Sequence, residues 1–159
     1  MDDLLKGKIA IVIGERDGVQ GPSITKCLSA AGAEIAFSVT ECFVWTAAGA
    51  MDAETQENIK KIAEDVKSDS NKEIIVVLGA GDIEGALISA ETVTSGDPSF
   101  TGPLAGVPLG LPVYHILEPI MEEAIPKDVY QENIGIVAML SDRESIGREF
   151  NKIREKLKI

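Results

Sequence analysis

The chain has 159 residues, of which 45% are hydrophobic and 26% are charged. This size and composition fit one globular domain spanning residues 1–159. The formal net charge of -11 at pH 7 disfavours nucleic acid as a partner, because an acidic surface repels phosphate backbones. The apolar run at 9–13 is too short for a signal peptide or a membrane span, so we expect no membrane association and a cytoplasmic location.

Short apolar runs alternate with helical patterns along the chain. The runs at 9–13, 34–39, 73–79 and 111–116 indicate strands. The first and third are continuously apolar, which is typical of strands covered by helices on both faces. The alternation predicts an α/β fold, specifically a three-layer α/β/α domain, Rossmann-like or flavodoxin-like, with a mostly parallel sheet of about four to five strands.

The helix boundaries carry their own signals. Pro22 suits the first turn of a helix and Gly32 suits its C-terminal cap. Asp52 is a natural N-cap for the next helix, and Ser141 with Glu144 forms a capping-box pattern before the last one. Apolar residues at helical spacing mark the buried faces of three helices: Ile59, Ile62, Ala63 and Val66; Ile83, Ala86, Leu87 and Ala90; Ile146, Phe150, Ile153 and Leu157.

Residues 95–112 are rich in glycine and proline and predict a long irregular segment. A loop of this length in a compact domain is functional or disordered. Its apolar side chains favour a packed segment: Phe100, Leu104, Val107, Leu109 and Leu111.

A glycine-rich turn at 14–21 follows the first strand and opens the first helix. The end of such a strand is a place where a phosphate can approach a helix N-terminus. Its spacing, however, is not that of dinucleotide binders, and Glu15 and Asp17 would repel a pyrophosphate. We therefore favour a structural tight turn, and we interpret Asp82, after a second glycine pair, as an N-cap.

Candidate chemical groups are few. His115 is the only histidine and ends the fourth predicted strand, so it either assists proton transfer or is a structural histidine with a hydrogen-bonded ring. Two cysteines 15 positions apart do not form a zinc pattern, and no metal is expected. Cys27 lies in a helical pattern and is expected to be a buried apolar residue.

Cys42 lies at a predicted strand-to-helix junction. If a helix N-terminus faces the sulfur there, it would lower the pKa of the thiol. Taken alone, this position leaves a reactive thiol and an ordinary cysteine as alternatives. Trp45, three residues later, reads as a partly buried aromatic residue.

Three separated segments, in the same order, resemble the selenoprotein A family of glycine reductase complexes. Residues 40–52, TECFVWTAAGAMD, are similar to its redox segment, Cys-Phe-Val-selenocysteine-Thr-Ala-Ala-Gly-Ala-Met-Asp. GERDGVQGP at 14–22 is similar to its N-terminal glycine motif, and residues 90–119 are similar to its long Gly/Pro segment. The similarity extends from about residue 7 to 157, which makes it far more specific than any single motif.

The resemblance implies a redox and carboxymethyl-carrier subunit of glycine, sarcosine or betaine reductase. In that family, protein B activates the substrate amine, and the selenolate at position 45 displaces the nitrogen and carries the carboxymethyl group. Protein C receives the two-carbon unit as an acetyl thioester. Position 45 and Cys42 are left joined as a selenide–sulfide, which thioredoxin reduces. No separate cofactor is implied, because selenocysteine is an intrinsic residue of the native family member.

The chain departs from the family at the decisive position, since Trp45 stands where selenocysteine is expected. The two codons, UGA and UGG, differ by one base. A recombinant gene with a changed codon, a host that reads UGA as tryptophan, and a natural tryptophan variant are the alternatives. Indole has no comparable nucleophile, so the Trp45 form is expected to fold but to be inactive.

Two other functions compete with this interpretation. One is a flavodoxin-like module that binds a nucleotide or an anion at the strand ends without redox chemistry. The other is a structural or regulatory subunit with no chemistry of its own.

Overall fold

A four-stranded sheet forms the centre of the computed structural model, which describes residues 3–42, 50–69 and 71–159. The strands are β1 (Ile9–Glu15), β2 (Glu34–Glu41), β3 (Ile74–Leu78) and β4 (Val113–His115). They lie in the order β2-β1-β3-β4, and all three pairs of neighbours are parallel. The predicted α/β class and parallel sheet are therefore confirmed, with four strands in the described residues.

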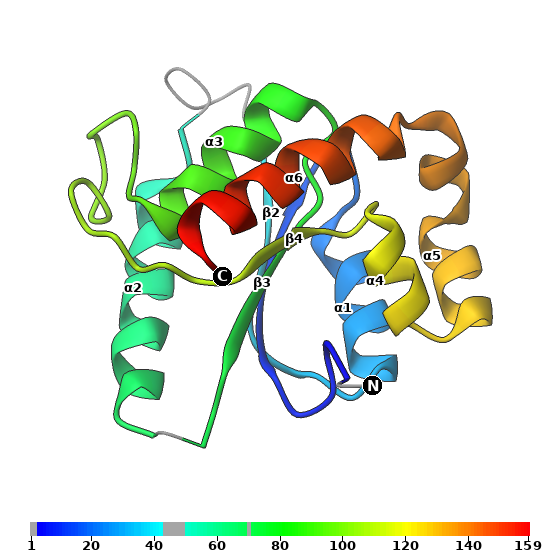
Figure 1. Cartoon of the computed structure of the whole chain (residues 1–159), viewed down its shortest axis with the longest axis horizontal. Helices are drawn as coiled ribbons and strands as arrows, with labels where there is room; N and C mark the ends of the chain where they lie inside the picture. Colours follow the sequence, from blue (N-terminus) through cyan, green and yellow to red (C-terminus); the bar gives the residue numbers. More distant parts are fainter. Residues whose placement is uncertain (1–2, 43–49, 70) are drawn as a thin grey trace.

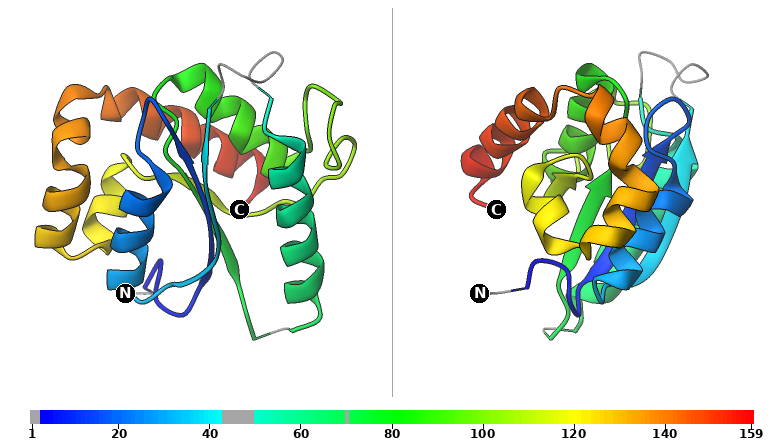
Figure 2. Two further views of the ribbon diagram at one scale, coloured as in Figure 1. Left: turned by 180° about the vertical axis from the view of Figure 1, so that it is seen from behind. Right: turned by 90° about the vertical axis from the view of Figure 1, so that its right-hand side faces the viewer.

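Helices cover both faces of this sheet. The helices are α1 (Gly21–Ala30), α2 (Ala53–Lys67), α3 (Ile83–Thr94), α4 (Pro119–Ala124), α5 (Lys127–Leu140) and α6 (Arg143–Leu157). Figure 1 views the sheet edge-on, with α1, α4 and α5 on one side and α2 and α3 on the other. The views in Figure 2 show the same two layers, and α6 packs against α3 and along β4 at the edge of the sheet.

The strands differ in burial because they differ in position. Every residue of the central strand β1 is buried, as its run of isoleucine and valine predicts. The edge strand β2 alternates instead, with Phe37 and Val39 packed against the core and Thr40 exposed. Thr40 lies on the α1 side of the sheet, where its Oγ1 accepts a hydrogen bond of 2.9 Å from Gly21 N. Phe37, Val39 and Glu41 consequently share the opposite face, toward α2.

Most predicted helix boundaries are confirmed. Pro22 lies in the first turn of α1, and Gly32 follows its end with a φ of 93°, a left-handed conformation that favours glycine. Asp52 caps α2 by accepting a hydrogen bond of 2.9 Å from Glu54 N. Asp82 caps α3 in the same way, with Gly85 N as the donor.

The predicted capping box of Ser141 and Glu144 is wrong. Asp142 is the N-cap of α6, and its Oδ1 accepts a hydrogen bond of 3.1 Å from Ser145 N. The Ser141 hydroxyl instead donates back to Val137 O in α5, at 2.6 Å. Aspartate and serine are comparably good N-caps, so the tight connection to α5 selects the starting residue.

The Gly/Pro segment at 95–112 is organised around one carboxylate. Asp97 is buried and accepts hydrogen bonds from the backbone of Ser99, Thr101 and Gly102. The Gln56 amide of α2 donates to Asp97 Oδ2 at 3.2 Å, and its oxygen accepts from the backbone N–H of residue 104 at 3.0 Å. The segment is thus tied to α2 by polar contacts as well as by packing.

The prediction that the apolar side chains of this segment pack is confirmed for most of them. Leu104 and Leu111 are buried, and Val107 and Leu109 pack partly against the core. It is wrong for Phe100, which is 74% exposed on a turn where its φ is 55°. Because the Asp97 hydrogen bonds fix that turn, the ring points away from the core.

None of the helices in the described ranges combines the length and the apolar character needed to cross a membrane.

Candidate functional site

Cys42 follows the last residue of β2 at the carboxyl edge of the sheet. The loops at this edge form the ligand crevice in parallel α/β sheets. Cys42 is partly exposed and is not in a disulfide. The predicted position of Cys42 at the end of the second strand is therefore confirmed.

A hollow of about 470 Å³ lies beside Cys42, between β2 and the first turns of α2. From the strand side it is lined by Phe37, Val39, Thr40, Glu41 and Cys42. From α2 it is lined by Asp52, Glu54, Thr55 and Asn58. Cys42 therefore borders a hollow with a mixed polar and apolar lining at the N-terminal end of a 15-residue helix.

Glu41 is the buried carboxyl group of this hollow. The side chain is 4% exposed, and its Oε1 has no hydrogen-bond partner among the described residues. Burial raises the pKa of Glu41, and the nearby Asp52 carboxylate raises it further. Hydrogen bonds from the Thr55 hydroxyl and the Asp52 backbone oppose this shift but do not reverse it. The net effect is a Glu41 pKa above its ordinary value, with burial as the main cause.

Trp45, the other predicted site residue, lies outside the described residues. The structure therefore places Cys42 at the strand end but does not test the predicted pairing of positions 42 and 45.

His115, the predicted assisting residue, is completely buried at the end of β4. Its Nδ1 accepts a hydrogen bond of 3.1 Å from Leu117 N, so the proton of the neutral ring lies on Nε2. Nε2–H donates to Ala80 O at 2.8 Å. Burial lowers the pKa of His115 to about 4, although the Ala80 contact opposes this shift. The fixed neutral ring favours the structural interpretation of His115.

The surroundings of His115 extend this structural role to α6. The rings of His115 and Phe150 meet edge to face, with centroids 5.6 Å apart. His115 N donates to Glu118 Oε2 at 2.8 Å, and Glu118 pairs with Arg154 of α6. The Arg154 guanidinium also lies over the Tyr114 ring, 4.2 Å from its centroid. These contacts hold the last helix against the last strand.

The glycine-rich turn after β1 has the geometry of a structural turn. A Cβ on Gly18 would overlap Gly79 O and the backbone of Gly81, so the turns after β1 and β3 pack backbone to backbone. The Glu15 carboxylate accepts hydrogen bonds from Asp17 N and Gly81 N. Backbone donors that an anion would need are therefore already engaged by this protein's own carboxylate, which disfavours the nucleotide-binding alternative.

Cys27 behaves as its helical pattern predicts. The side chain is fully buried on α1. Burial raises the pKa of the Cys27 thiol to about 11, which keeps it protonated and unreactive near neutral pH. Cys42 is therefore the more accessible of the two cysteines.

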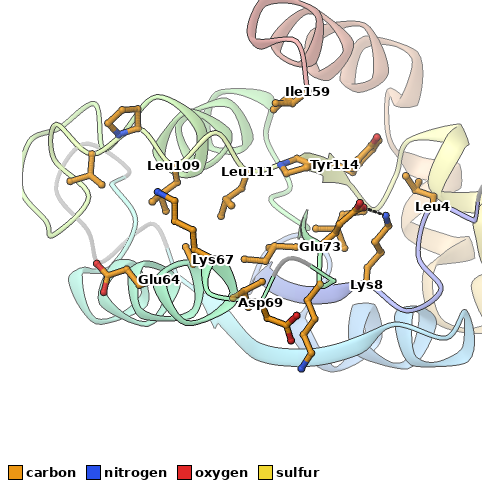
Figure 3. Close-up of a pocket in the computed structure, with 18 residues that line it drawn as sticks. Leu4, Lys8, Glu64, Lys67, Asp69, Glu73, Leu109, Leu111, Tyr114 and Ile159 are labelled. Carbon is orange, nitrogen blue, oxygen red and sulfur yellow. Dashed lines mark hydrogen bonds and ion pairs between the residues drawn. The ribbon is translucent and has the colours of Figure 1, made fainter.

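A larger hollow of about 740 Å³ lies at the opposite edge of the sheet (Figure 3). It is bordered by Lys67 of α2, by Glu73 before β3 and by Leu109 and Leu111 of the Gly/Pro segment. Lys8 and Glu73 form an ion pair there. Since it lies at the amino ends of the strands, this hollow is separate from the site around Cys42.

Sequence reasoning missed Glu41 and Thr55 as members of the site. A signal for Glu41 was present, because Phe37, Val39 and Glu41 follow the two-residue period of a strand face. Thr55 gave no comparable signal, since its position depends on how α2 approaches β2.

Comparison with known proteins identifies the family to which the chain is similar. The family model described as glycine reductase complex selenoprotein A matches residues 5–154. Glycine/sarcosine/betaine reductase complex component A of Gottschalkia purinilytica is 49% identical over 151 residues, covering 95% of this chain and 99% of the relative. The component A of Symbiobacterium thermophilum is 48% identical, covering 96% of both chains. Component A1 of Peptoclostridium acidaminophilum is 48% identical, covering 96% of this chain and 95% of the relative.

No solved structure matches the chain. The family match and these relatives extend over nearly the whole sequence, including the segments around Cys42 and the Gly/Pro segment. The chain therefore belongs to the selenoprotein A family of the glycine reductase complex.

Proposed function

We propose that this chain is the redox and carboxymethyl-carrier subunit of a glycine, sarcosine or betaine reductase complex. The observation that carries the proposal is the placement of Cys42. It is a partly exposed thiol at the carboxyl edge of a parallel sheet, three positions before the residue that stands in place of selenocysteine. Full-length similarity to component A proteins supports the same role.

In the proposed cycle, a selenolate at position 45 attacks the α-carbon of an amine that protein B has activated. The carbon–nitrogen bond breaks, and its electron pair leaves with the nitrogen. The product on this subunit is a carboxymethyl selenoether. Protein C then receives the two-carbon unit as an acetyl thioester, which phosphate cleaves to acetyl phosphate.

Transfer to protein C reduces the two-carbon unit and oxidises this subunit. Position 45 and the Cys42 sulfur give up the two electrons and are left joined as a selenide–sulfide. Thioredoxin, a dithiol, reduces that bond by thiol exchange and becomes a disulfide. The spacing of two residues between the two positions suits such a short bridge, as in Cys-x-x-Cys motifs.

The Trp45 chain is proposed to be inactive in this cycle. An indole ring supplies neither the nucleophile that carries the carboxymethyl group nor the second atom of the bridge. Cys42 then remains a single thiol without its partner. The chain is nevertheless expected to visit the same partner proteins through transient, polar contacts.

Reconstitution with proteins B and C, thioredoxin, thioredoxin reductase and the amine substrate tests the proposal. A Trp45→selenocysteine variant is expected to support acetyl phosphate formation, whereas the Trp45 chain is not. A Trp45→Cys variant is expected to form an internal disulfide with Cys42 that thioredoxin reduces. Acetyl phosphate formation by the Trp45 chain itself would overturn the role assigned to position 45.

The alternative of a regulatory subunit without chemistry predicts a different result. Under that alternative, neither variant cycles with thioredoxin. A Trp45→Cys, Cys42→Ser double variant is the matched control, because it keeps a thiol at position 45 but removes its partner.

A further inference from the structure

Helix α5, which faces the viewer in the right-hand view of Figure 2, exposes three large apolar side chains. Ile136, Met139 and Leu140 are 76%, 85% and 84% exposed. Their spacing of three and four residues places them together on one face of the helix, which we call the α5 face. The buried contacts of α5 are made by other residues, among them Tyr130 and Ile134. Neighbouring exposed apolar side chains of this kind mark a surface that contacts another molecule.

A hollow of about 280 Å³ adjoins the α5 face at the carboxyl edge of the sheet. Leu140 belongs to both, and Val137 and Leu117 contribute to the apolar part of the lining. Other parts of the lining come from the turns after β1 and β3.

The position of this hollow in the sheet is one that commonly binds other molecules. The chain leaves β1 toward α1 on one face of the sheet, and it leaves the neighbouring β3 toward α3 on the other face (Figure 1). Such a switch point is the usual binding crevice of a parallel α/β sheet. Pockets for organic ligands measure about 300–1,000 Å³, so this smaller hollow suits one inserted side chain better than a cofactor.

One turn joins the hollow to the end of β2. Arg16 N donates a hydrogen bond of 2.9 Å to Glu41 O, and the next residue, Asp17, lines the hollow. The Arg16 and Asp17 side chains lie 3.6 Å apart and offset each other's charge. Cys42 follows Glu41 directly. A protein bound at the hollow therefore lies at the same edge of the sheet as Cys42.

The charges that flank the α5 face are negative. Glu132 lies one turn before Ile136 on the same helix, and Asp142 follows the end of the helix. Both side chains are exposed. The nearby Arg143 does not offset them, because its guanidinium is paired with the Glu122 carboxylate at 2.9 Å. The α5 face is thus an apolar surface with an acidic rim.

This acidic rim favours a different protein over a second copy of the chain as the partner. Two copies would bring the same acidic groups together, and each chain carries a formal net charge of -11. A partner surface with lysine and arginine around an apolar side chain, by contrast, is complementary to the α5 face in both charge and hydropathy.

We propose that the α5 face and the adjoining hollow form the docking surface for another component of the reductase complex. That component presents a large apolar side chain, which enters the hollow beside Leu140. Lysine and arginine around this side chain meet Glu132 and Asp142. The partner is thereby held at the edge of the sheet where Cys42 lies. The choice of a reductase component as the partner rests on the proposed function, whereas the place of the surface rests on the residues described above.

Biolayer interferometry tests the proposal with the intact Trp45 chain and, in separate runs, purified protein B and purified protein C. The test variant combines Ile136→Gln, Met139→Gln and Leu140→Gln. Glutamine forms helices about as well as the residues it replaces, so these exposed substitutions are expected to leave the fold intact. Dissociation from at least one of the two proteins is expected to become at least about tenfold faster. An unchanged dissociation rate for both proteins, or no binding of the native chain to either, would overturn the proposal.

Phe100→Gln is the matched control for this variant. It also replaces a largely exposed apolar side chain, but one on the Gly/Pro segment. We expect it to change the dissociation rate less than about twofold. Equal effects of the control and the triple variant would overturn the proposal, because exposed apolar groups in general would then bind the partner. If circular dichroism shows that the triple variant is unfolded, Met139→Gln alone is used, with dissociation expected to become about threefold faster.

Charge reversal tests the acidic rim separately. Glu132→Lys is expected to slow association at least about threefold at low salt, and this effect should shrink in about 0.5 M NaCl because salt screens exposed charges. Glu64→Lys is the control, since it reverses an exposed charge on α2 at the amino edge of the sheet. Equal association rates of the two variants would overturn the proposed match of charges.

Sedimentation velocity of the native chain tests the competing occupant. A monomer is expected, and a dimer that the triple variant dissociates would overturn the proposal, because a second copy would then cover the α5 face. The binding assay needs no chemistry at position 45. Active reconstitution together with unchanged binding of the triple variant would therefore overturn this inference alone. Lost binding of the triple variant together with an inactive Trp45→selenocysteine variant would overturn the proposed function alone.

Discussion

Arg154 of α6 and Glu118 after β4 form a buried ion pair, with Arg154 Nη2 2.6 Å from Glu118 Oε1. A second nitrogen, Nη1, lies 3.0 Å from Glu118 Oε2 and 3.0 Å from Val113 O. The two side chains are 8% and 2% exposed. Such a bidentate contact ties the C-terminal helix to the edge of the sheet.

Removing one partner of this pair should destabilise the protein strongly. Arg154→Ala leaves the Glu118 carboxylate buried and unpaired, and we expect the free energy of unfolding to fall by about 3–5 kcal/mol. Urea unfolding followed by circular dichroism measures this loss. Lys152→Ala, which breaks the exposed pair with Glu149 on the same helix, is the control and should cost less than about 1 kcal/mol. Equal effects of the two substitutions would contradict the prediction.

The single histidine offers a direct test of the structural role of His115. Its pKa is lowered to about 4 by burial, so its ring resonances should not titrate between pH 8 and 5. Proton NMR against pH measures the titration of the His115 ring directly, because the chain has one histidine and its ring resonances need no assignment to a residue. A midpoint near neutrality would instead favour the proton-transfer role.

The same depressed pKa should make stability depend on pH. The unfolded chain binds the His115 proton below about pH 6.5, whereas the folded chain resists it until about pH 4. The contribution of the neutral His115 ring to the free energy of unfolding is therefore fully present above pH 6.5. It is lost as the pH falls toward 4, which lowers the free energy of unfolding by about 3 kcal/mol. Urea midpoints of the native chain and His115→Gln should converge as the pH falls. Parallel curves would contradict this linkage.

The backbone contact between two turns should make Gly18 intolerant of a side chain. Gly18→Ala places a Cβ against Gly79 O and Gly81, so we expect a loss of at least about 2 kcal/mol of unfolding free energy. Gly147 is the matched control. It lies in α6 with its nearest neighbour at 3.9 Å, so Gly147→Ala should raise helix propensity and stabilise by about 0.5–1 kcal/mol. Thermal unfolding distinguishes the two, and a neutral Gly18→Ala would refute the close packing.

The Gly/Pro segment should depend on Asp97 for its conformation. Burial opposes ionisation of Asp97, but hydrogen bonds from Ser99, Gln56 and Thr101 outweigh it and lower its pKa. Asp97→Ala removes these acceptors, and we expect proteolytic cleavage within residues 95–112 to become at least about tenfold faster, which corresponds to the loss of about 1.4 kcal/mol of local stability. Limited proteolysis with mass spectrometry locates the cuts. Ser99→Ala removes only one donor and should have a smaller effect.

Much of this architecture follows from local patterns. The buried runs of isoleucine and valine predicted β1 and β3, and Asp52 and Asp82 predicted two helix starts, because these signals act within a few residues. The capping box at Ser141 failed because tertiary packing selected Asp142 from two adequate caps. Phe100 failed because a hydrogen-bonded turn, which hydrophobicity does not report, sets its direction.

The site was predicted unevenly for the same reason. Cys42 was found from its position after a strand and from the resemblance of its segment to a known family. Glu41 shares the two-residue period of Phe37 and Val39, which gave a signal for its face of β2. Thr55 gave no such signal, because its place in the site depends on how α2 approaches β2, a contact between segments that are separate in the sequence.

The two edge strands of the sheet, β2 and β4, differ in what lies beside them. At β4, Arg154 of α6 donates a hydrogen bond to Val113 O and α6 packs along the strand, so the protein's own last helix covers part of this edge. At the other margin, β2 pairs with β1 alone among the residues that the structure describes. Cys42 follows β2, so it lies beside the edge of the sheet that has no second strand among the described residues.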